Sequence, residues 1–515
     1  MSRKIRIILA VLAAVALFGY QSWRKHQPAA QAANSNASAQ PAHVEPAQLR
    51  KLGQLSFKPC TLPGAAGREG LPAQCTTLSV PENRSEPNGR KIDLRIAWVP
   101  ADEDAEQHDD PVFLIAGGPG QSAVDSYAML APVFQGVLNQ RDVILVDQRG
   151  TGGSNKLACD VGDESASAPD AAAMLHLTTS CIDTLSKRAD LRQYGTTEAV
   201  ADLDAVRTAI GAKQINLYGV SYGTRVAQQY AMRHPQQTRS IVLDSVVPNT
   251  LHLSNIWARN LDDALALQFG VCTKDAQCKA KFGDPRAELG NLLATLRNAP
   301  PQVSYRDPLS GEQKTEALTA DEVAGLVRMF AYMPAIASIL PLQIHEAAQG
   351  RYAGLKALTS MLRTQMKDQM AMGMQLSVVC SEDADQAPAT VQDDSGTVLG
   401  NDMARFMTQA CTQWPKGKVP ADFHNALTTP VPALVLEGQF DPVTPPRYGE
   451  EVAKSLPNGR LLVLNGQGHN VIASGCMPRL FAKFIETADA KSLDAKCLDA
   501  LSPTPSFIDY NGWTP

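Results

Sequence analysis

The chain reads Gln214-Ile-Asn-Leu-Tyr-Gly-Val-Ser-Tyr-Gly-Thr-Arg-Val-Ala-Gln-Gln-Tyr230 near its middle. An apolar strand runs into the turn Gly219-Val-Ser221-Tyr-Gly223, and a helix-forming stretch follows. Nucleophilic serines are presented on such strand-to-helix turns, which are so tight that the flanking positions accept only glycine. An ordinary glycine-rich turn has the same residues, so the rest of the chain decides between the two interpretations.

Five further apolar runs have the length and composition of buried parallel strands. They cover residues 111–116, 141–147, 238–244, 431–437 and 459–465. Helical patterns lie between several of them, as in residues 198–210, where the apolar side chains can share one face. Strands that alternate with helices predict an α/β fold with a mostly parallel, doubly wound sheet. Ligands of such sheets bind at the carboxyl ends of the strands, where all the candidate chemical residues fall.

Two of these strand ends carry the partners that a serine nucleophile needs. A serine hydroxyl is a poor nucleophile at neutral pH and requires a base that a third group orients. Asp441 follows one of the last two runs and His469 follows the other. The order Ser221, Asp441, His469 is that of the α/β-hydrolases and predicts a catalytic triad. Taken singly, Asp441 also fits an Asx turn before proline, and His469 fits a structural loop histidine.

Acyl transfer also needs N–H donors for the oxyanion. One donor is predicted to be the backbone N–H of Tyr222, the residue after the serine. The other is expected from Gly117-Gly118-Pro119-Gly120, where bare backbone can approach a substrate, and we assign it to Gly118. An ordinary Gly-Pro turn is the alternative for this run.

Three motifs together resemble a known enzyme family. They are Gly117-Gly118-Pro119-Gly120, Asp147-Gln148-Arg149-Gly150-Thr151-Gly152-Gly153-Ser154 and Gly219-Val-Ser221-Tyr-Gly223. The combination is similar to the proline iminopeptidase family of serine exopeptidases, and most of all to its secreted tripeptidyl aminopeptidase branch. The similarity extends from about Cys75 to the C-terminus. It implies an α/β-hydrolase fold and a serine peptidase that acts on peptides with a free N-terminus.

One further segment resembles the same branch. Val378-Val-Cys380-Ser-Glu382 is similar to its Cys-x-Asp signature, with glutamate where the branch usually has aspartate. An aminopeptidase must recognise a free α-ammonium, and a buried ammonium needs a carboxylate partner. We expect Glu382, with Asp383 beside it, to bind the substrate amine, although such a run is also typical of a solvated acidic loop. Ala116 stands where proline iminopeptidases commonly have histidine, which argues against strict proline specificity.

The chain is longer than a hydrolase core requires. It has 515 residues, whereas such a core needs roughly 200 to 250, so an insertion is expected. We predict core at 51–249 and 426–515, the latter with a C-terminal disulfide segment, and a mainly helical cap at 250–425. A cap would close the far side of the cleft and admit only a chain end. Within it, an i+4 stripe either packs the cap on the core or lines an apolar pocket. The stripe consists of Leu362, Met366, Met370 and Met374.

Residues 1–27 are predicted to be a signal peptide or a signal anchor. Arg3, Lys4 and Arg6 precede an apolar stretch at about residues 7–20. The stretch is short for a membrane span, which favours a signal peptide, whereas the lack of a nearby small-residue cleavage site leaves membrane anchoring open. Residues 28–50 have the composition of a flexible linker. The protein is therefore expected to be exported, to the periplasm or beyond the cell.

Cysteine usage agrees with export, because all ten cysteines lie beyond the apolar stretch and their number is even. Sequence order favours five neighbour pairs, with a set of buried free thiols as the alternative. The pairs are Cys60 with Cys75, Cys159 with Cys181, Cys272 with Cys278, Cys380 with Cys411, and Cys476 with Cys497. No cysteine and histidine arrangement has zinc spacing, so no metal is predicted.

Charge and motifs exclude other classes of protein. A formal charge of −5 without a basic stripe argues against nucleic-acid binding. No cofactor is expected, because there is no Gly-x-x-x-x-Gly-Lys, and Gly150-Thr-Gly152-Gly153 lacks the context of a dinucleotide loop. We therefore expect an exported serine aminopeptidase that releases short N-terminal peptides or residues. The alternatives are an exported carboxylesterase or amidase and a non-catalytic binding protein on the same fold.

Overall fold

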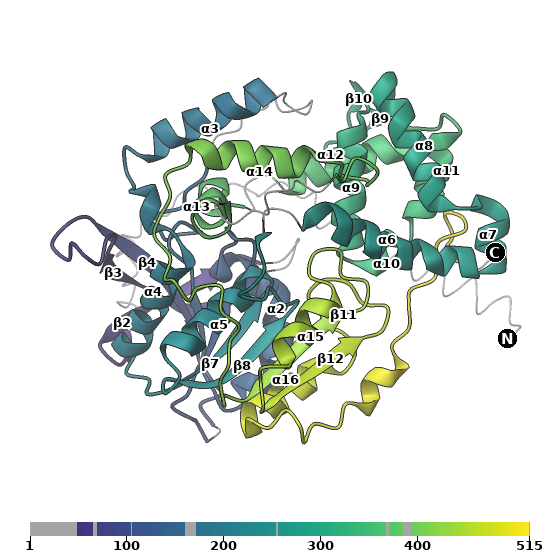
Figure 1. Cartoon of the computed structure of the whole chain (residues 1–515). Helices are drawn as coiled ribbons and strands as arrows, with labels where there is room; N and C mark the ends of the chain where they lie inside the picture. Colours follow the sequence, from purple (N-terminus) through teal and green to yellow (C-terminus); the bar gives the residue numbers. More distant parts are fainter. Residues whose placement is uncertain are drawn as a thin grey trace, which may run out of the picture. The chain divides into compact units, whose positions relative to one another are not determined.

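The centre of the fold is a sheet whose strands come from both halves of the chain (Figure 1). Within the described residues, ten strands pair in the order β1-β2-β3-β4-β6-β5-β7-β8-β11-β12. Pairings from β1 to β6 are antiparallel, and those from β6 to β12 are parallel. The strands are β1 (Arg50–Leu52), β2 (Leu55–Leu62), β3 (Leu71–Pro81), β4 (Lys91–Val99), β5 (Val112–Ile115), β6 (Val143–Val146), β7 (Ile215–Val220), β8 (Thr238–Asp244), β11 (Ala433–Gly438) and β12 (Gly459–Leu464). The prediction of a mostly parallel sheet is confirmed.

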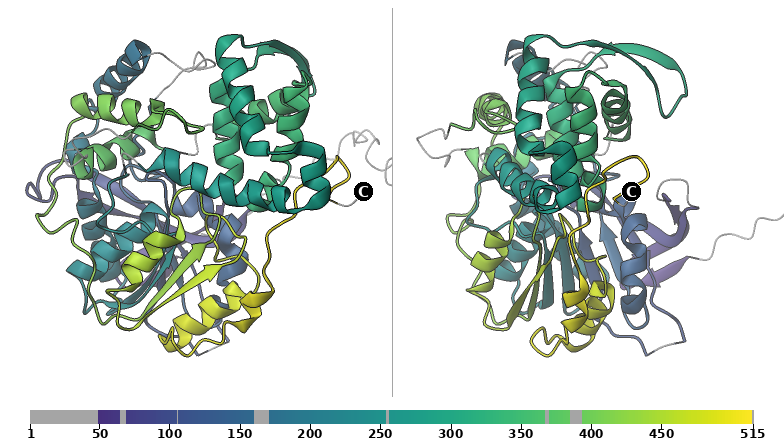
Figure 2. Two further views of the ribbon diagram at one scale, coloured as in Figure 1. Left: turned by 45° about the vertical axis from the view of Figure 1, so that its right-hand side comes forward. Right: turned by 90° about the vertical axis from the view of Figure 1, so that its right-hand side faces the viewer.

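The apolar runs become buried strands because helices cover both faces of the sheet (Figure 2). Side chains alternate along each strand, so Val112 and Leu114 enter one hydrophobic core while Phe113 and Ile115 enter the other. The first core also takes residues of α2 and α16, and the second takes residues of α4 and α5. These helices are α2 (Ala123–Leu138), α4 (Thr196–Ala209), α5 (Tyr222–Arg233) and α16 (Met477–Thr487).

The segment between β8 and β11 is mainly helical, as predicted, and it packs as two groups. Most of its helices surround a separate hydrophobic core, to which the β9–β10 hairpin adds Val303. Its last helices join the core of the sheet and pack with α3, which precedes β7 in the chain (Figure 1). The first group comprises α6 (Trp257–Lys274), α7 (Ala276–Phe282), α8 (Pro285–Asn298), β9 (Gln302–Arg306), β10 (Gln313–Ala317), α9 (Ala320–Ala331), α10 (Pro334–Ala337), α11 (Leu340–Ala348) and α12 (Ala353–Met366). The second comprises α13 (Met372–Glu382) and α14 (Asp402–Gln413), with α3 (Ala171–Leu185).

The predicted methionine stripe is divided between these two groups. Leu362 lies in α12 and packs against the separate core, whereas Met374 lies in α13 and is buried in the core of the sheet. The side chains therefore do not share one helix face. The i+4 spacing is interrupted because the chain leaves α12 before it enters α13.

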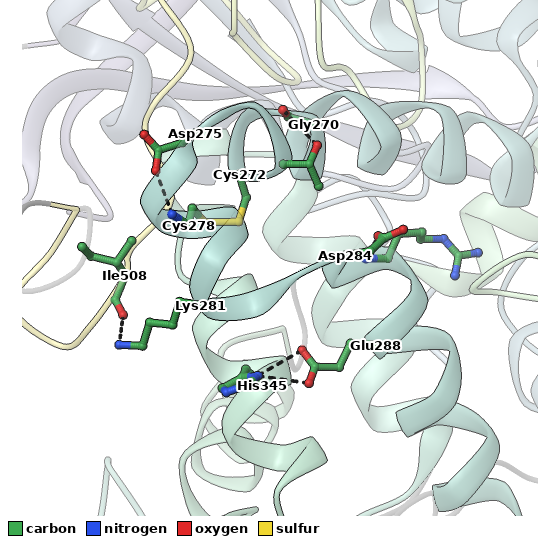
Figure 3. The surroundings of a disulfide bond; sticks show 11 residues. Gly270, Cys272, Asp275, Cys278, Lys281, Asp284, Glu288, His345 and Ile508 are labelled. Carbon is green, nitrogen blue, oxygen red and sulfur yellow. Dashed lines mark hydrogen bonds and ion pairs between the residues drawn. A yellow bond between two sulfur atoms is a disulfide. The ribbon is translucent and has the colours of Figure 1, made fainter.

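Five disulfides join sequence neighbours and tie elements together. They link Cys60 to Cys75, Cys159 to Cys181, Cys272 to Cys278, Cys380 to Cys411, and Cys476 to Cys497. The pair between Cys380 and Cys411 connects α13 to α14. Figure 3 shows the pair between Cys272 and Cys278, where α6 meets α7 and Lys281 donates a hydrogen bond to the carbonyl of Ile508. The C-terminal segment thus reaches the inserted helices.

The computed structural model describes residues 49–64, 69–104, 106–159, 171–253, 256–366, 370–384 and 393–513, with residues 171–174 and 366 described by their backbone alone. The predicted signal segment and all but the end of the predicted linker lie outside these residues. Within them, no helix combines the length and the apolar character that crossing a membrane requires.

Candidate active site

Ser221 stands at the sharp turn between β7 and α5. Its backbone has a φ of 54° and a ψ of −123°, a conformation that a residue with a side chain rarely adopts. A Cβ on Gly219 would lie 2.4 Å from the carbonyl oxygen of Gly223, and one on Gly223 would lie 2.3 Å from that of Ile115. Only glycine fits at either position. The Ser221 N–H donates to the carbonyl oxygen of Asp244 at 2.9 Å, and its hydroxyl makes no hydrogen bond within the described residues.

Asp441 and His469 meet beyond the ends of β11 and β12. The Nδ1 atom of His469 lies 2.7 Å from Oδ2 of Asp441, which is 1% exposed. The other oxygen of Asp441 accepts the N–H groups of Val443 and Thr444, each at 2.8 Å. The first of these bonds is an Asx turn, and the same carboxylate also contacts His469. The turn fixes the carboxylate, and the carboxylate engages Nδ1 of the imidazole, so Nε2 is the nitrogen that remains for a proton from a nucleophile.

Two further contacts hold this pair, and sequence reasoning missed both. The Thr444 hydroxyl donates to Oδ2 of Asp441 at 3.0 Å and lies 3.4 Å from Nδ1 of His469. Tyr332, at the end of α9, accepts the His469 N–H on its carbonyl oxygen at 2.9 Å. Its ring also packs against the imidazole, with centroids 5.0 Å apart. Thr444 is three residues from Asp441 and could have been found by spacing, whereas Tyr332 has no local signal.

The glycine run after β5 lies beside the nucleophile turn. A Cβ on Gly117 would lie 3.0 Å from the Cβ of Ser221, so the backbone approaches the serine as closely as glycine allows. Gly118 has a φ of 111°, and its N–H has no hydrogen-bond acceptor among the described residues. Tyr222 is the first residue of α5, where an N–H has no intrahelical acceptor. Among the described residues, neither predicted oxyanion donor has an N–H acceptor; Tyr222 follows Ser221 directly, and Gly118 follows Gly117, which lies beside it.

Two buried side chains of the motif from Asp147 to Ser154 form hydrogen bonds with neighbouring elements. Asp147 is fully buried and accepts the Ser122 hydroxyl at 2.6 Å and the Gly153 N–H at 2.9 Å, which ties the loop after β6 to the start of α2. Arg149 is also fully buried and forms two hydrogen bonds of 2.7 Å with the carboxylate of Asp202 on α4. These bonds tie the motif to α2 and α4.

Comparison with known proteins agrees with this geometry. A family model described as alpha/beta hydrolase fold matches residues 110–285, and one described as TAP-like protein matches residues 396–497. The serine protease Hip1 of Mycobacterium tuberculosis is 25% identical over 487 residues, which are 87% of this chain and 92% of that protein. The tripeptidyl aminopeptidase of Streptomyces coelicolor is 25% identical over 471 residues, 84% of each chain. The family models agree with an α/β-hydrolase fold, and the two relatives that match over most of their length are named as peptidases.

Shorter and more distant similarities have also been found for this α/β hydrolase. A proline iminopeptidase of Xylella fastidiosa is 26% identical over 139 residues, which are 27% of this chain and 33% of that protein. The crystal structure of a proline iminopeptidase from Mycobacterium smegmatis superposes with a TM-score of 0.42 and 17% identity, over 80% of this chain and 99% of that one.

The second predicted site, at Glu382 and Asp383, lies where α13 meets α4 and α5. Both side chains are fully buried, and both are paired with Arg225. Asp383 accepts two hydrogen bonds from Arg225, at 3.1 and 3.2 Å, and one from the Leu253 N–H. Glu382 accepts the Thr196 N–H on Oε1 at 2.7 Å, and its Oε2 has no hydrogen-bond partner among the described residues. Glu382 and Asp383 are therefore not part of a solvated acidic loop.

Burial dominates the electrostatics of this pair. It raises the pKa of Glu382 to about 7, because one guanidinium, shared with Asp383, does not replace the lost hydration. A third carboxylate, that of Glu198, lies close by on α4. A Cβ on Gly195 would be 3.1 Å from Oε2 of Glu198 and 3.4 Å from Oε1 of Glu382. Burial raises the pKa of Glu198 as well, although this side chain is partly exposed. The region carries more acidic groups than cations.

One group of possible metal ligands lies on the edge of this cluster. A nitrogen of His252, a nitrogen of His424 and an oxygen of Asp383 lie within 4.8 Å of one another. Both nitrogens of His424 already face carbonyl oxygens, of Asn249 and Glu382, at 2.8 Å. Because Asp383 is also paired with a guanidinium, these three residues do not fit a divalent cation.

Proposed function

We propose that the protein is an exported serine aminopeptidase that releases short N-terminal peptides or single residues through an acyl-enzyme. Ser221 is the nucleophile, His469 the general base and Asp441 the group that orients the base. The N–H groups of Gly118 and Tyr222 receive the oxyanion. The observation that carries the proposal is the 2.7 Å contact between Asp441 and His469 beyond the ends of β11 and β12, in the same sheet whose strand β7 ends at the strained Ser221 turn.

The steps follow from these placements. His469 takes the hydroxyl proton of Ser221 on Nε2 as the serine oxygen bonds to the scissile carbonyl carbon. The carbonyl oxygen becomes an oxyanion, which the two free N–H groups stabilise. His469 then gives the proton to the leaving amine, and water repeats the sequence to release the acyl product. Asp441 stays ionised throughout and stabilises the imidazolium.

Recognition of a free amine is assigned to Glu382. Asp383 has both oxygens engaged, whereas Glu382 has one oxygen without a hydrogen-bond partner in the described region. A substrate ammonium would supply the cation that Arg225 alone does not provide for two buried carboxylates. Because the Glu382 side chain is fully buried, an ammonium reaches it only when neighbouring side chains move. Two relatives that match over most of their length are named as a serine protease and a tripeptidyl aminopeptidase, which also supports a peptidase.

Export is supported by the five disulfides, which form and persist in oxidising compartments. Cell fractionation tests it. We expect the activity outside the cytoplasm, and activity confined to the cytoplasm would contradict the proposal.

A substrate panel tests the aminopeptidase assignment. The wild-type protein is assayed on tripeptidyl and aminoacyl anilides, on their N-acetylated forms and on a short-chain nitrophenyl ester. We expect kcat/KM for the free-amine anilides to exceed that for the acetylated ones by at least about 10-fold, the scale of one buried charge contact. Turnover of the ester alone would contradict the proposal and favour an esterase.

Glu382→Gln tests the amine site within the same panel. The substitution keeps size and removes charge, so KM for free-amine anilides should rise by about 10-fold. KM for the ester should not change, which serves as the internal control. An unchanged KM for the free-amine substrates would remove Glu382 from substrate binding.

A further inference from the structure

Asp244 contacts both the nucleophile turn and the histidine loop without belonging to either. It is the last residue of β8 and is fully buried. Its carbonyl oxygen accepts the N–H of Ser221 at 2.9 Å. Its side-chain oxygens accept the N–H groups of Val471 at 2.9 Å and Ile472 at 3.1 Å. These two residues follow closely after His469, so one aspartate is bonded to both halves of the candidate site.

Ser245, the next residue, adds one more hydrogen bond to the loop after His469. The hydroxyl of Ser245 accepts the Asn470 N–H at 2.8 Å, so Asp244 and Ser245 together bind three successive N–H groups after His469. Ser245 and Asn470 have φ values of 62° and 65°, which are unfavourable for residues with side chains. Such conformations persist where the surroundings determine them, and they concentrate at functional sites.

The groups that face the Asp244 carboxylate come from three neighbouring elements. The Tyr218 hydroxyl of β7 donates to it at 3.0 Å, His469 lies on the loop after β12, and Glu437 lies at the end of β11. Within the described residues, no lysine or arginine pairs with it. Burial raises the pKa of Asp244 to about 6, against the hydrogen bonds from the two loop N–H groups and Tyr218, which lower it.

We propose that Asp244 is a positioning residue of the hydrolytic reaction, which holds the turn of Ser221 in register with the loop of His469. It does not touch the reacting atoms. Its effect is geometric, since a displacement of about 1 Å between nucleophile and base costs about 10²-fold in rate. The inference rests on the proposed nucleophile and base and is independent of the proposed amine specificity.

Ionisation of Asp244 is part of this role. A carboxylate offers acceptor sites to all three donors, whereas a protonated carboxyl group turns one oxygen into a donor and loses an N–H. The pKa of Asp244 near 6 exceeds the ordinary value of 3.8, so the fully bonded form is present above pH 6 and is lost as the pH falls through that value. Asn at this position imitates the protonated form at every pH.

The substitution Asp244→Asn therefore has a signature that simple loss of stability lacks. With a nitrophenyl ester and a free-amine anilide as substrates, kcat at pH 8 should fall about 10- to 100-fold, with KM within about 2-fold. The ratio of wild-type to variant kcat should shrink toward pH 5, where wild-type Asp244 is itself protonated. An unchanged kcat at pH 8, or a ratio that is the same at pH 5 and pH 8, would overturn the inference.

Two further variants keep the test decisive should Asp244→Asn fold poorly. Tyr218→Phe keeps the ring and removes one hydrogen bond that lowers the pKa of Asp244, so the acid limb of kcat should move to higher pH. An unmoved limb would count against the inference.

Glu437→Gln is the matched control. Glu437 is buried and accepts the Val246 N–H at 3.1 Å, and the amide keeps an oxygen that accepts this bond, so kcat should stay within about 2-fold.

Ser221→Ala separates this inference from the proposed function. If Ser221→Ala retains full turnover, the proposed nucleophile is wrong. If Ser221→Ala is inactive while Asp244→Asn and Tyr218→Phe match the wild-type protein across the pH range, only the role of Asp244 fails.

Discussion

Two of the places where the protein buries carboxylates are built differently. At the strand ends, Asp441 accepts two backbone N–H groups and a hydroxyl in addition to the imidazole of His469. Where α13 meets α4 and α5, Glu382 and Asp383 share the single guanidinium of Arg225. The strand-end carboxylate has donors for each oxygen, whereas Glu382 has one oxygen without a hydrogen-bond partner among the described residues.

This difference separates a site that performs chemistry from one suited to binding a cation. A catalytic carboxylate must stay ionised and immobile while the charge on its histidine changes, and short-range donors provide both. A buried carboxylate that shares its only guanidinium with a second carboxylate is costly to ionise, so burial raises the pKa of Glu382 to about 7. A ligand with an ammonium group would remove that cost. Substitutions at the two places test each side of this contrast.

The largest effect is expected at the strand ends. Asp441→Asn keeps the turn but replaces one acceptor of the imidazole N–H by an amide, which favours the wrong tautomer of His469. We expect kcat to fall by about 10³- to 10⁴-fold with little change in KM, as in serine triads generally. Steady-state kinetics with the ester and the anilide measure it. A loss below about 10-fold would mean that Asp441 is only a turn residue.

The next effect concerns stability at the second site. Arg225→Met removes the shared cation and leaves two carboxylates buried, which costs about 3–5 kcal/mol in the free energy of unfolding. The loss should be largest at pH 8 and smaller at pH 5, where Glu382 is protonated. Denaturant titrations at the two pH values test this. A loss under about 1 kcal/mol at pH 8 would show that the carboxylates do not depend on Arg225.

Glu382→Gln should stabilise the protein at alkaline pH. The folded pKa of about 7 exceeds the ordinary 4.5, so ionisation of Glu382 opposes folding increasingly from pH 4.5 to pH 7 and fully above it. The amide removes this penalty, about 3 kcal/mol at pH 8, and makes little difference at pH 4.5. Thermal melts across this pH range measure the gain. A variant less stable than the wild-type protein at pH 8 would contradict the idea that ionised Glu382 destabilises the fold.

The smallest effect is expected where the inserted helices touch the base. Tyr332→Leu keeps the backbone bond to the His469 N–H and removes the ring against the imidazole. An aromatic contact of this kind contributes about 1 kcal/mol, so kcat/KM should fall about 3- to 10-fold while the melting temperature falls by a few degrees at most. A variant equal to the wild-type protein would show that the imidazole is held by the core alone.

The same contrast explains what the sequence can predict. The strand-end site is local: Asp441 meets donors two and three residues away, and each candidate residue follows an apolar strand. Parallel strands bring their carboxyl ends to one edge, so the order of strands and loops along the chain is enough to predict that Asp441 and His469 meet. Neighbour pairing of the cysteines follows the same short-range logic.

The second site depends on contacts that no local pattern encodes. Glu382 contacts Thr196 and Arg225, which lie in helices that precede the inserted segment in the chain. Tyr332 and Asp244 were missed for the same reason, since each reaches His469 or its loop from a distant element. The division of the insertion into two packing groups also escaped prediction, because α12 and α13 share an apolar spacing that only tertiary packing interrupts.

Ser221 as nucleophile is tested most directly by covalent labelling with a fluorophosphonate, followed by peptide mass spectrometry. We predict one equivalent of adduct on the peptide that contains Ser221, loss of turnover in step with labelling, and neither labelling nor turnover in Ser221→Ala. Labelling at another residue, or full turnover by Ser221→Ala, would contradict the proposed catalytic site.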